Sequence, residues 1–305
     1  MACVSVRGLT KRYGRVRAVD DLTFEAPPGQ ITGFLGPNGA GKTTTLRALV
    51  GLVRPTRGSA LINGRRYDQL PEPRRLVGAV LESGASRPGR SGRDHLRVLA
   101  ATTGVGDSRV EEVLDLVDLT DASSRRVSGY SMGMHQRLGL AAALLGDPEI
   151  LLLDEPANGL DPEGIAWLRA LLRGFASEGR TVLISSHILS EVAQTVDRVV
   201  IIDHGKLKFD GSLQELGGGT VSVRTGQADR LAAALSRLGY RVDVTGTGLE
   251  VRGATAEQIG RLAASERIAL SELTTGNASL EAAFLQLTSG EREWAAPSAT
   301  LRSAN

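Results

Sequence analysis

Cysteine is almost absent from this chain, since Cys3 is the only one among 305 residues. A single thiol excludes an intramolecular disulfide and a metal cluster held by several thiolates. Long apolar runs are missing as well. The longest, at 138–145, is only about a third to a half of the ~18–20 residues that a membrane-spanning helix needs. We therefore expect no direct membrane insertion, and any role at a membrane has to depend on a partner.

An excess of charge of one sign is also lacking. Lys and Arg total 36 against 34 Asp and Glu, which gives a formal net charge of +2. Nucleic acids and acidic membrane surfaces are bound through clustered basic residues, so this balance predicts no nucleic-acid partner. The first residues, MACVSVRGLTKRYG, contain no apolar core of the kind found in secretion signals. The expected location is therefore cytoplasmic.

Lysine is scarce in a way that makes its positions informative. Of the 36 basic residues only four are lysines, namely Lys11, Lys42, Lys206 and Lys208. Arginine supplies the rest, and with the abundant alanine and glycine this indicates genomic codon bias rather than a function. A lysine inside a motif is therefore unlikely to be compositional noise.

The chain before residue 217 alternates strands with helices. Apolar strands are predicted at 31–35, 150–155 and 181–186, each followed by a helical segment. The first ~65 residues otherwise contain short strands separated by turns. Strands alternating with helices predict an α/β fold with a mostly parallel sheet covered on both faces.

Three consecutive glycines at 217–219 predict a domain boundary. The segment after them has the order strand, helix, two strands, helix, strand and a final helix, which predicts a small ferredoxin-like α+β unit. We expect a first domain at 1–216, an accessory domain at 220–289 and a disordered tail at 290–305.

A glycine-rich loop follows the strand at 31–35. Residues 36–43 spell GPNGAGKT and match the phosphate-loop pattern G-x-x-x-x-G-K-S/T. Its glycines allow backbone N–H groups to surround phosphate oxygens, and the helix after it directs its positive end at the same anion. Lys42 is expected to hold the β- and γ-phosphates, and the Thr43 hydroxyl to ligate Mg²⁺.

Two acids follow the apolar strand that begins at residue 150. Because ligands bind at the carboxyl ends of the strands in open α/β sheets, Asp154 is expected near Mg²⁺. Glu155 is the candidate general base that polarises the attacking water, although a carboxylate here can also simply cap the next helix. His187 follows another strand at the same edge and can hydrogen-bond the γ-phosphate, whereas a lone histidine is more often structural.

The order of these motifs resembles that of the ATP-binding subunits of ABC transporters. The segment VSGYSMGMHQRLGLAAALLGDPEILLLDEPANGLDP at 127–162 is similar to the signature segment of that family, followed by Walker B and the D-loop. The resemblance implies a P-loop NTPase of ABC type, with an N-terminal antiparallel β subdomain and a helical signature subdomain. It implies an ATPase with ATP and Mg²⁺ as cofactors.

The same resemblance implies roles for individual residues. Tyr13 matches the aromatic residue that stacks on adenine, with packing inside a β-hairpin as the alternative. Asp154 and Glu155 match Walker B and the catalytic glutamate, His187 the switch histidine, and Asp161 the D-loop aspartate. The residues that match Walker A are Gly36, Pro37, Asn38, Gly39, Ala40, Gly41, Lys42, Thr43 and Thr44.

The resemblance also implies partners. Ser131 and Gly133 match signature residues that cap the γ-phosphate held by the opposite subunit, so a homodimer, or a pair with another ATPase subunit, is expected. A separate integral-membrane permease is expected too, with this chain peripheral on the inner face of the cell membrane.

Two positions depart from the family pattern. Met132 stands where the signature has its first glycine, which adds bulk near the dimer interface. Glu82 stands where the Q-loop glutamine is usual, and its carboxylate can still ligate Mg²⁺. This variant, with the accessory unit, is similar to the drug- and antibiotic-exporter branch (daunorubicin and lantibiotic resistance).

Export of a drug-, antibiotic- or peptide-like compound is therefore the function we expect. Import of a polar solute is the main alternative, and the neighbouring genes would distinguish the two. A soluble ABC ATPase acting on ribosomes or DNA is disfavoured by the single ATPase unit and the near-neutral charge. A regulatory protein without hydrolysis is disfavoured because every group needed for hydrolysis is present.

Overall fold

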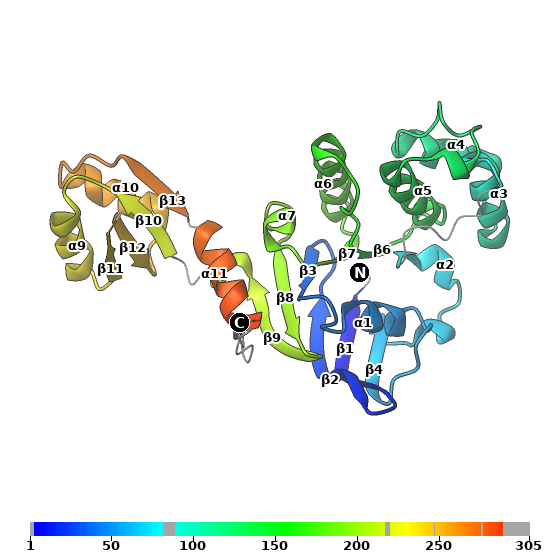
Figure 1. The fold of residues 1–305 in the computed structure, drawn as a ribbon, viewed down its shortest axis with the longest axis horizontal. Helices are drawn as coiled ribbons and strands as arrows, with labels where there is room; N and C mark the ends of the chain where they lie inside the picture. The colour runs from blue at the N-terminus through cyan, green and yellow to red at the C-terminus, as the bar shows by residue number, and fades with distance from the viewer. Residues whose placement is uncertain (1–2, 82–88, 217–219, 247, 276, 289–305) are drawn as a thin grey trace, which may run out of the picture.

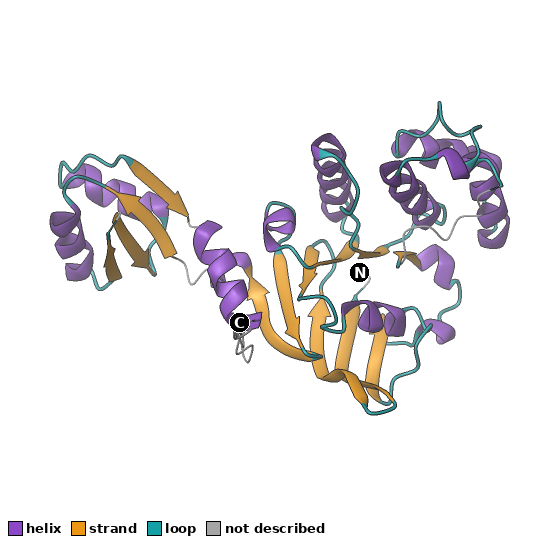
Figure 2. Cartoon of the chain, viewed as in Figure 1, coloured by secondary structure: helices purple, strands orange, loops and turns teal. Residues whose placement is uncertain are grey.

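The structure is a computed structural model of the chain. It describes residues 3–81, 89–216, 220–246, 248–275 and 277–288. The strands of this part form three sheets, and helices separate or cover them (Figures 1 and 2).

The central sheet carries six strands in the order β5-β6-β7-β3-β8-β9. All neighbours are parallel except β9, which pairs antiparallel with β8. Strands β3, β6 and β7 are buried along their whole length, which explains why each contains apolar residues on both faces. The predicted α/β class is confirmed. The strands are β3 (Ile31–Leu35), β5 (Val77–Val80), β6 (Ile150–Asp154), β7 (Thr181–Ser186), β8 (Arg198–Asp203) and β9 (Lys206–Ser212).

A second, antiparallel sheet packs on one side of the central sheet. Its order is β2-β1-β4, formed by β1 (Val4–Tyr13), β2 (Val16–Ala26) and β4 (Arg57–Ile62). Its apolar side chains share one core with the helix α1 (Lys42–Leu49) and with the central strands. Phe24 of β2 stacks on Phe34 of β3 with ring centroids 5.0 Å apart, so the two sheets are in direct contact.

Helices cover the other side of the central sheet and share a second core with it. Three separate α-helices lie between residues 92 and 144, and Gly104 in a left-handed conformation ends the first of them. The helices are α3 (Gly92–Thr103), α4 (Asp107–Leu116), α5 (Met132–Leu144), α6 (Pro162–Ser177) and α7 (Leu189–Ala193). The shorter elements are η1 (Tyr67–Gln69), α2 (Pro73–Leu76), η2 (Val127–Gly129) and α8 (Leu213–Leu216).

The accessory unit forms the third sheet, with the order β11-β12-β10-β13 and antiparallel neighbours throughout. The order of its elements along the chain is βαββαβ, as predicted for a ferredoxin-like unit, and it has a core of its own. Its elements are β10 (Thr220–Arg224), α9 (Ala228–Arg237), β11 (Arg241–Thr245), β12 (Gly248–Arg252), α10 (Ala256–Ser265) and β13 (Glu272–Thr275).

The last helix, α11 (Asn277–Thr288), leaves the accessory unit and returns to the central sheet. It contacts α7, α8, β8 and β9 (Figure 1). Its apolar residues Leu280, Ala283, Phe284 and Leu287 recur at helical spacing and pack against the core on the helical side of the sheet. The predicted domain boundaries stay a prediction, and the predicted tail at 290–305 lies outside the described residues.

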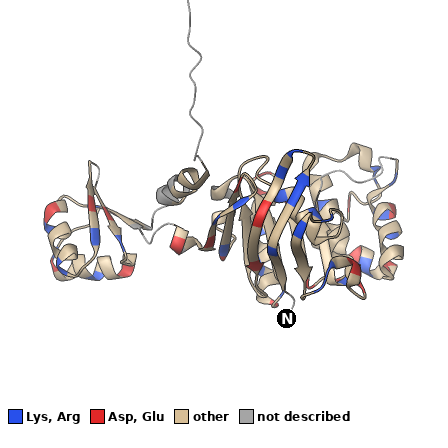
Figure 3. Ribbon diagram, turned by 90° about the horizontal axis from the view of Figure 1, so that it is seen from below, with Lys and Arg blue, Asp and Glu red and all other residues tan. Residues whose placement is uncertain are grey.

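Acidic and basic residues are interspersed over both parts of the molecule (Figure 3). Within the described part of the chain, no helix has both the length and the apolar character needed to cross a membrane.

The packing of α11 is open to a stability test. Phe284→Ala removes a ring packed against the core, and we expect the free energy of unfolding to fall by about 1–3 kcal/mol because the residue is only partly buried. Leu238→Ala, at an exposed position after α9, is the control and should change stability by less than ~0.5 kcal/mol. Equal urea midpoints for the two variants would contradict the docking of α11.

Candidate active site

The glycine-rich loop joins the buried end of β3 to the first turn of α1. Two of its glycines lie too close to neighbouring backbone to carry a side chain. A Cβ on Gly36 would lie 2.3 Å from the Ile202 carbonyl oxygen, and one on Gly41 would lie 2.5 Å from the Ala18 carbonyl oxygen. Gly41 also has a φ of 106°, a left-handed conformation that favours glycine. The loop therefore wraps tightly against β8 and β2, with the N-terminus of α1 directed into it.

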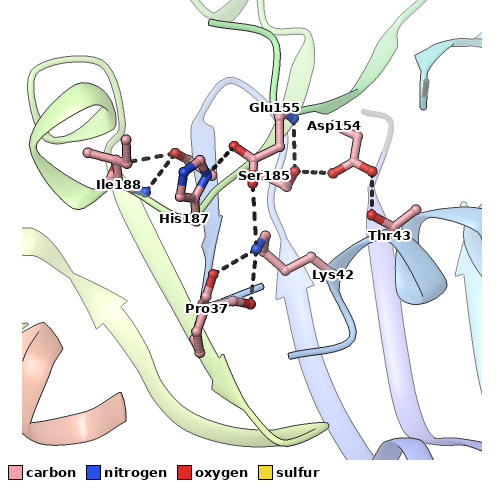
Figure 4. Close-up of polar contacts among 10 residues, drawn as sticks. Pro37, Lys42, Thr43, Asp154, Glu155, Ser185, His187 and Ile188 are labelled. Atoms are coloured by element: carbon pink, nitrogen blue, oxygen red, sulfur yellow. Dashed lines mark hydrogen bonds and ion pairs between the residues drawn. The ribbon is translucent and has the colours of Figure 1, made fainter. Parts of the chain in front are cut away.

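Lys42 is the first residue of α1, and its side chain is only 6% exposed. It folds back over the loop, where Nζ donates to the Gly36 carbonyl at 2.7 Å and to the Pro37 carbonyl at 3.3 Å (Figure 4). Nζ also lies 3.5 Å from Glu155 Oε1. Burial lowers the pKa of the Lys42 ammonium, while the Glu155 carboxylate acts in the opposite direction.

Asp154 ends β6 and is held through both carboxylate oxygens. The Thr43 hydroxyl donates to Oδ2 at 2.6 Å, and the Ser185 hydroxyl donates to Oδ1 (Figure 4). Thr43 comes from α1 and Ser185 from β7, so three elements meet at this carboxylate. Among the described residues, no group of three or more His, Cys, Asp or Glu side chains is arranged to hold a metal ion. Asp154 Oδ2 and the Thr43 hydroxyl are oxygen groups that can contact a cation at this point.

Glu155 leaves the sheet with a φ of 49°, in the left-handed region that residues with a Cβ seldom adopt. Its side chain reaches back to the loop, with Oε1 near Lys42 and Oε2 2.9 Å from His187 Nδ1. The carboxylate therefore lies between two nitrogen groups that can carry protons (Figure 4). The structure thus brings together Lys42, Thr43, Asp154, Glu155 and His187, which the sequence analysis had placed in one site.

Two other candidates cap helices away from this cluster. Ser131 is the N-cap of α5 and its hydroxyl accepts from the Met134 N–H at 3.2 Å, whereas Asp161 caps α6 and accepts from the Gly164 N–H at 2.8 Å. Neither has a hydrogen bond or ion pair to the Lys42 cluster within the described residues. Gly133 is the second residue of α5 and lies in the first turn, which Ser131 caps.

Met132 is 65% exposed and lies over the D-loop glycine. A Cβ on Gly159 would lie 2.5 Å from Met132 Cε, so the signature segment and the D-loop of the same chain are in contact.

Tyr13 lies at the end of β1 and its side chain is 48% exposed, so packing inside the hairpin does not bury it. Lys11 Nζ lies 4.8 Å from the centroid of the ring and also donates to the Arg54 carbonyl at 2.9 Å. One face of the ring is therefore covered by an ammonium group. Glu82, the candidate Q-loop residue, lies outside the described residues.

Sequence reasoning missed Ser185, which contacts both acids: it bonds the Asp154 carboxylate and accepts from the Glu155 backbone N–H at 3.0 Å. A partial signal was present, because two serines, Ser185 and Ser186, end β7 after the apolar run 182–184, but nothing in the sequence says which of them contacts the acids. The backbone N–H of Gly205, in the turn between β8 and β9, was missed too. It donates to the Ala40 carbonyl at 3.0 Å and so supports the phosphate loop.

Comparison with known proteins identifies the family of the chain. The family model described as "ABC transporter" matches residues 19–158, and a "Domain of unknown function" matches 219–281. An uncharacterized ABC transporter ATP-binding protein, YhcH of Bacillus subtilis (strain 168), is 35% identical over 95% of this chain and 97% of its own length. The chain belongs to the family of ABC transporter ATP-binding proteins.

Two further relatives have more specific names. The bacitracin transport ATP-binding protein BcrA of Bacillus licheniformis is 44% identical over 67% of this chain and 68% of its own. The lantibiotic transport ATP-binding protein SrtF of Streptococcus pyogenes is 39% identical over 70% of this chain and 95% of its own.

Solved structures agree on the fold. A structure of an "ATP binding subunit of ABC transporter" covers 85% of this ABC protein and 98% of its own chain, with 27% identity and a TM-score of 0.65. A dimeric ATP-binding cassette bound to ADP and Pi covers 68% and 98%, with 22% identity and a TM-score of 0.63. As a member of the family of ABC transporter ATP-binding proteins, this chain is an ATP-binding subunit and an ATPase.

The contacts of Lys42 predict its contribution to ATP binding. Because a hydrogen bond to a charged group contributes about 1.5–3 kcal/mol, Lys42→Ala should weaken ATP affinity roughly 10- to 100-fold in calorimetric titrations with magnesium present. Lys208→Ala, at an exposed position on β9, is the control and should leave the affinity unchanged. Wild-type affinity in the Lys42 variant would contradict a role in nucleotide binding.

Proposed function

We propose that this ATPase powers the export of a drug-, antibiotic- or peptide-like compound through a separate membrane permease, from the cytoplasmic face of the cell membrane. The observation that carries the proposal is the similarity to transport proteins named for bacitracin and for lantibiotics, at 44% and 39% identity. The geometry of the site supports ATP as the energy source, and the names of the relatives support the class of compound.

The residues at the end of β6 suit Mg²⁺. The Thr43 hydroxyl and Asp154 Oδ2 lie 2.6 Å apart, and hard oxygen donors are the ligands that Mg²⁺ prefers. A shared cation can replace the hydrogen bond between them with little movement of either side chain. Bound there, Mg²⁺ would offset the negative charge of the β- and γ-phosphates. We assign Thr43 and Asp154 to the metal, with Glu82 as a candidate third contact.

The same cluster supplies groups for binding and proton transfer. Lys42 Nζ now donates to two loop carbonyls, and it can exchange them for phosphate oxygens without leaving its buried position. Glu155, held between Lys42 and His187, is placed to orient a water molecule and accept its proton. His187 is proposed to keep the carboxylate in place and to hydrogen-bond the γ-phosphate. Tyr13 offers the ring face opposite Lys11 for stacking on adenine.

The signature residues support a dimer in which each copy completes the site of the other. Ser131 and Gly133 stand at the N-terminus of α5, where free backbone N–H groups favour an anion. The exposed side chain of Met132 beside them is an apolar contact for a partner. We propose a homodimer with Asp161 near the interface.

A groove of about 960 Å³ supports docking of the permease. It lies between the α1–β5 side and the α3–α5 side of the molecule, and most of its lining is apolar. Arg74, His95 and the exposed Leu52 are among the residues that line it. Residues of α1 and β5 form one wall of the groove, and residues of α3 and α5 form the other. An element bound between these walls would respond if one wall moved relative to the other. We propose that a cytoplasmic segment of the permease binds in this groove.

Glu155→Gln tests the chemistry. The amide keeps the shape of the side chain but cannot accept a proton, so ATP turnover should fall by about 100- to 10,000-fold while ATP binding persists. Glu178→Gln, on the surface at the end of α6, is the control and should hydrolyse ATP normally. Near wild-type phosphate release by the Glu155 variant would show that another group is the base.

Leu52→Glu tests the docking groove. A charge at this exposed apolar position should reduce recovery of the subunit with its membrane partner from detergent extracts by about tenfold, while basal ATPase activity of the isolated subunit stays unchanged. Leu238→Glu places the same charge on the accessory unit as a control. If both variants co-purify equally well, the permease binds elsewhere.

A further inference from the structure

The hydroxyl of Ser185 is fully buried and lies between the two acids of the site. Ser185 is the register partner of Asp154 across the parallel strands β6 and β7. Its Oγ donates to Asp154 Oδ1 and accepts from the backbone N–H of Glu155 at 3.0 Å (Figure 4). A single hydroxyl therefore donates a hydrogen bond to one acid and accepts another from the backbone of the next.

The first of these bonds gives the two oxygens of Asp154 different partners. Oδ1 is bonded to Ser185, while Oδ2 is directed at Thr43. Rotation of the carboxylate out of this plane would break both bonds, so Ser185 helps to fix the plane in which one oxygen faces the proposed metal position. Without the hydroxyl, the carboxylate could turn about its terminal bond, since that torsion is broad in energy.

The second bond holds the backbone of Glu155 where it leaves the sheet. A residue other than glycine with a φ of 49° is strained, and such a conformation persists only when its surroundings fix it. Ser185 accepts from the N–H of this residue and so stabilises the turn. The direction of the Glu155 Cβ, and hence the position of its carboxylate between Lys42 and His187, depends on that turn.

Neighbouring hydroxyls in the same sheet do not have this role. Ser186 bonds the backbone of Ile188, within its own turn. Thr32 on β3 is also fully buried, yet its hydroxyl has no hydrogen-bond partner among the described residues. Contact with both acids therefore distinguishes Ser185 from these two hydroxyls and does not follow from having a hydroxyl in the core.

We propose that Ser185 is a positioning residue for ATP hydrolysis, which orients Asp154 toward the metal and holds Glu155 in its left-handed turn. The proposal rests on the roles proposed above for Asp154 and Glu155. It predicts two separate defects when the hydroxyl is lost: a weaker response to Mg²⁺ and a slower hydrolytic step.

The test compares Ser185→Ala with the wild-type chain. We expect the Mg²⁺ concentration for half-maximal activity to rise about tenfold and kcat at saturating Mg²⁺ to fall roughly 10- to 100-fold, since each lost bond involves a group of the site. The Kd for ATP should change less than about threefold, because Lys42 and the phosphate loop are untouched. Ser185→Thr retains the hydroxyl and should restore the Mg²⁺ response.

Thr32→Val is the matched control, because it removes a buried hydroxyl without a partner and should change none of these quantities. Wild-type Mg²⁺ dependence and kcat in Ser185→Ala would overturn the proposal. So would a lower melting temperature and lower kcat without a change in Mg²⁺ dependence, since a merely structural role predicts that result.

Asp154→Asn separates the two levels of the argument. If it shifts the Mg²⁺ response while Ser185→Ala does not, the positioning role fails and the assignment of Asp154 stands. If Asp154→Asn leaves the Mg²⁺ response unchanged, the proposed metal assignment itself is wrong.

Discussion

Parallel hydrogen bonding joins β3 and β6 to opposite edges of β7, so that all three strands end at the same edge of the central sheet. This pairing brings the phosphate loop, the two acids and His187 together, although the loop and His187 are about 150 residues apart in the chain. A slip in the register between β6 and β7 would separate Asp154 from Ser185 and turn alternate side chains to the wrong face. The polar contacts of the site therefore depend on the apolar strands beneath them.

The buried position of Lys42 depends in turn on the shape of the loop. Burying an ammonium group is costly unless it has partners, and Lys42 has two carbonyls and Glu155. These carbonyls point inward because the loop is pressed against β8 at Gly36 and tied to the β8–β9 turn through Ala40. The antiparallel end of the sheet thus contributes to a site formed by its parallel strands.

The sequence was sufficient for the features that depend on local pattern. The spacing of the phosphate loop and the apolar strand ending in Asp154 and Glu155 predicted the core of the site. The order of strands and helices along the chain predicted the α/β fold of the first part and the ferredoxin-like fold of the accessory unit. It could not show Ser185 between the acids or Gly205 beneath Ala40, because these contacts come from strand register and from a turn distant in the chain. The packing of α11 was missed for the same reason, since its apolar stripe does not reveal which surface covers it.

The accessory unit begins and ends at nearly the same point, because Val221 at its start pairs with Thr275 at its end. Folding of this unit therefore brings together the two ends of the segment 220–275, which makes up most of the chain between α8 and α11. The remaining connections are short, and the entropy lost when a helix docks at the end of a long flexible segment is largely avoided. Because α11 packs on the central sheet, the accessory unit is attached to the rest of the molecule at both of its ends. Cleavage of the chain in one connection would leave the unit attached through the other.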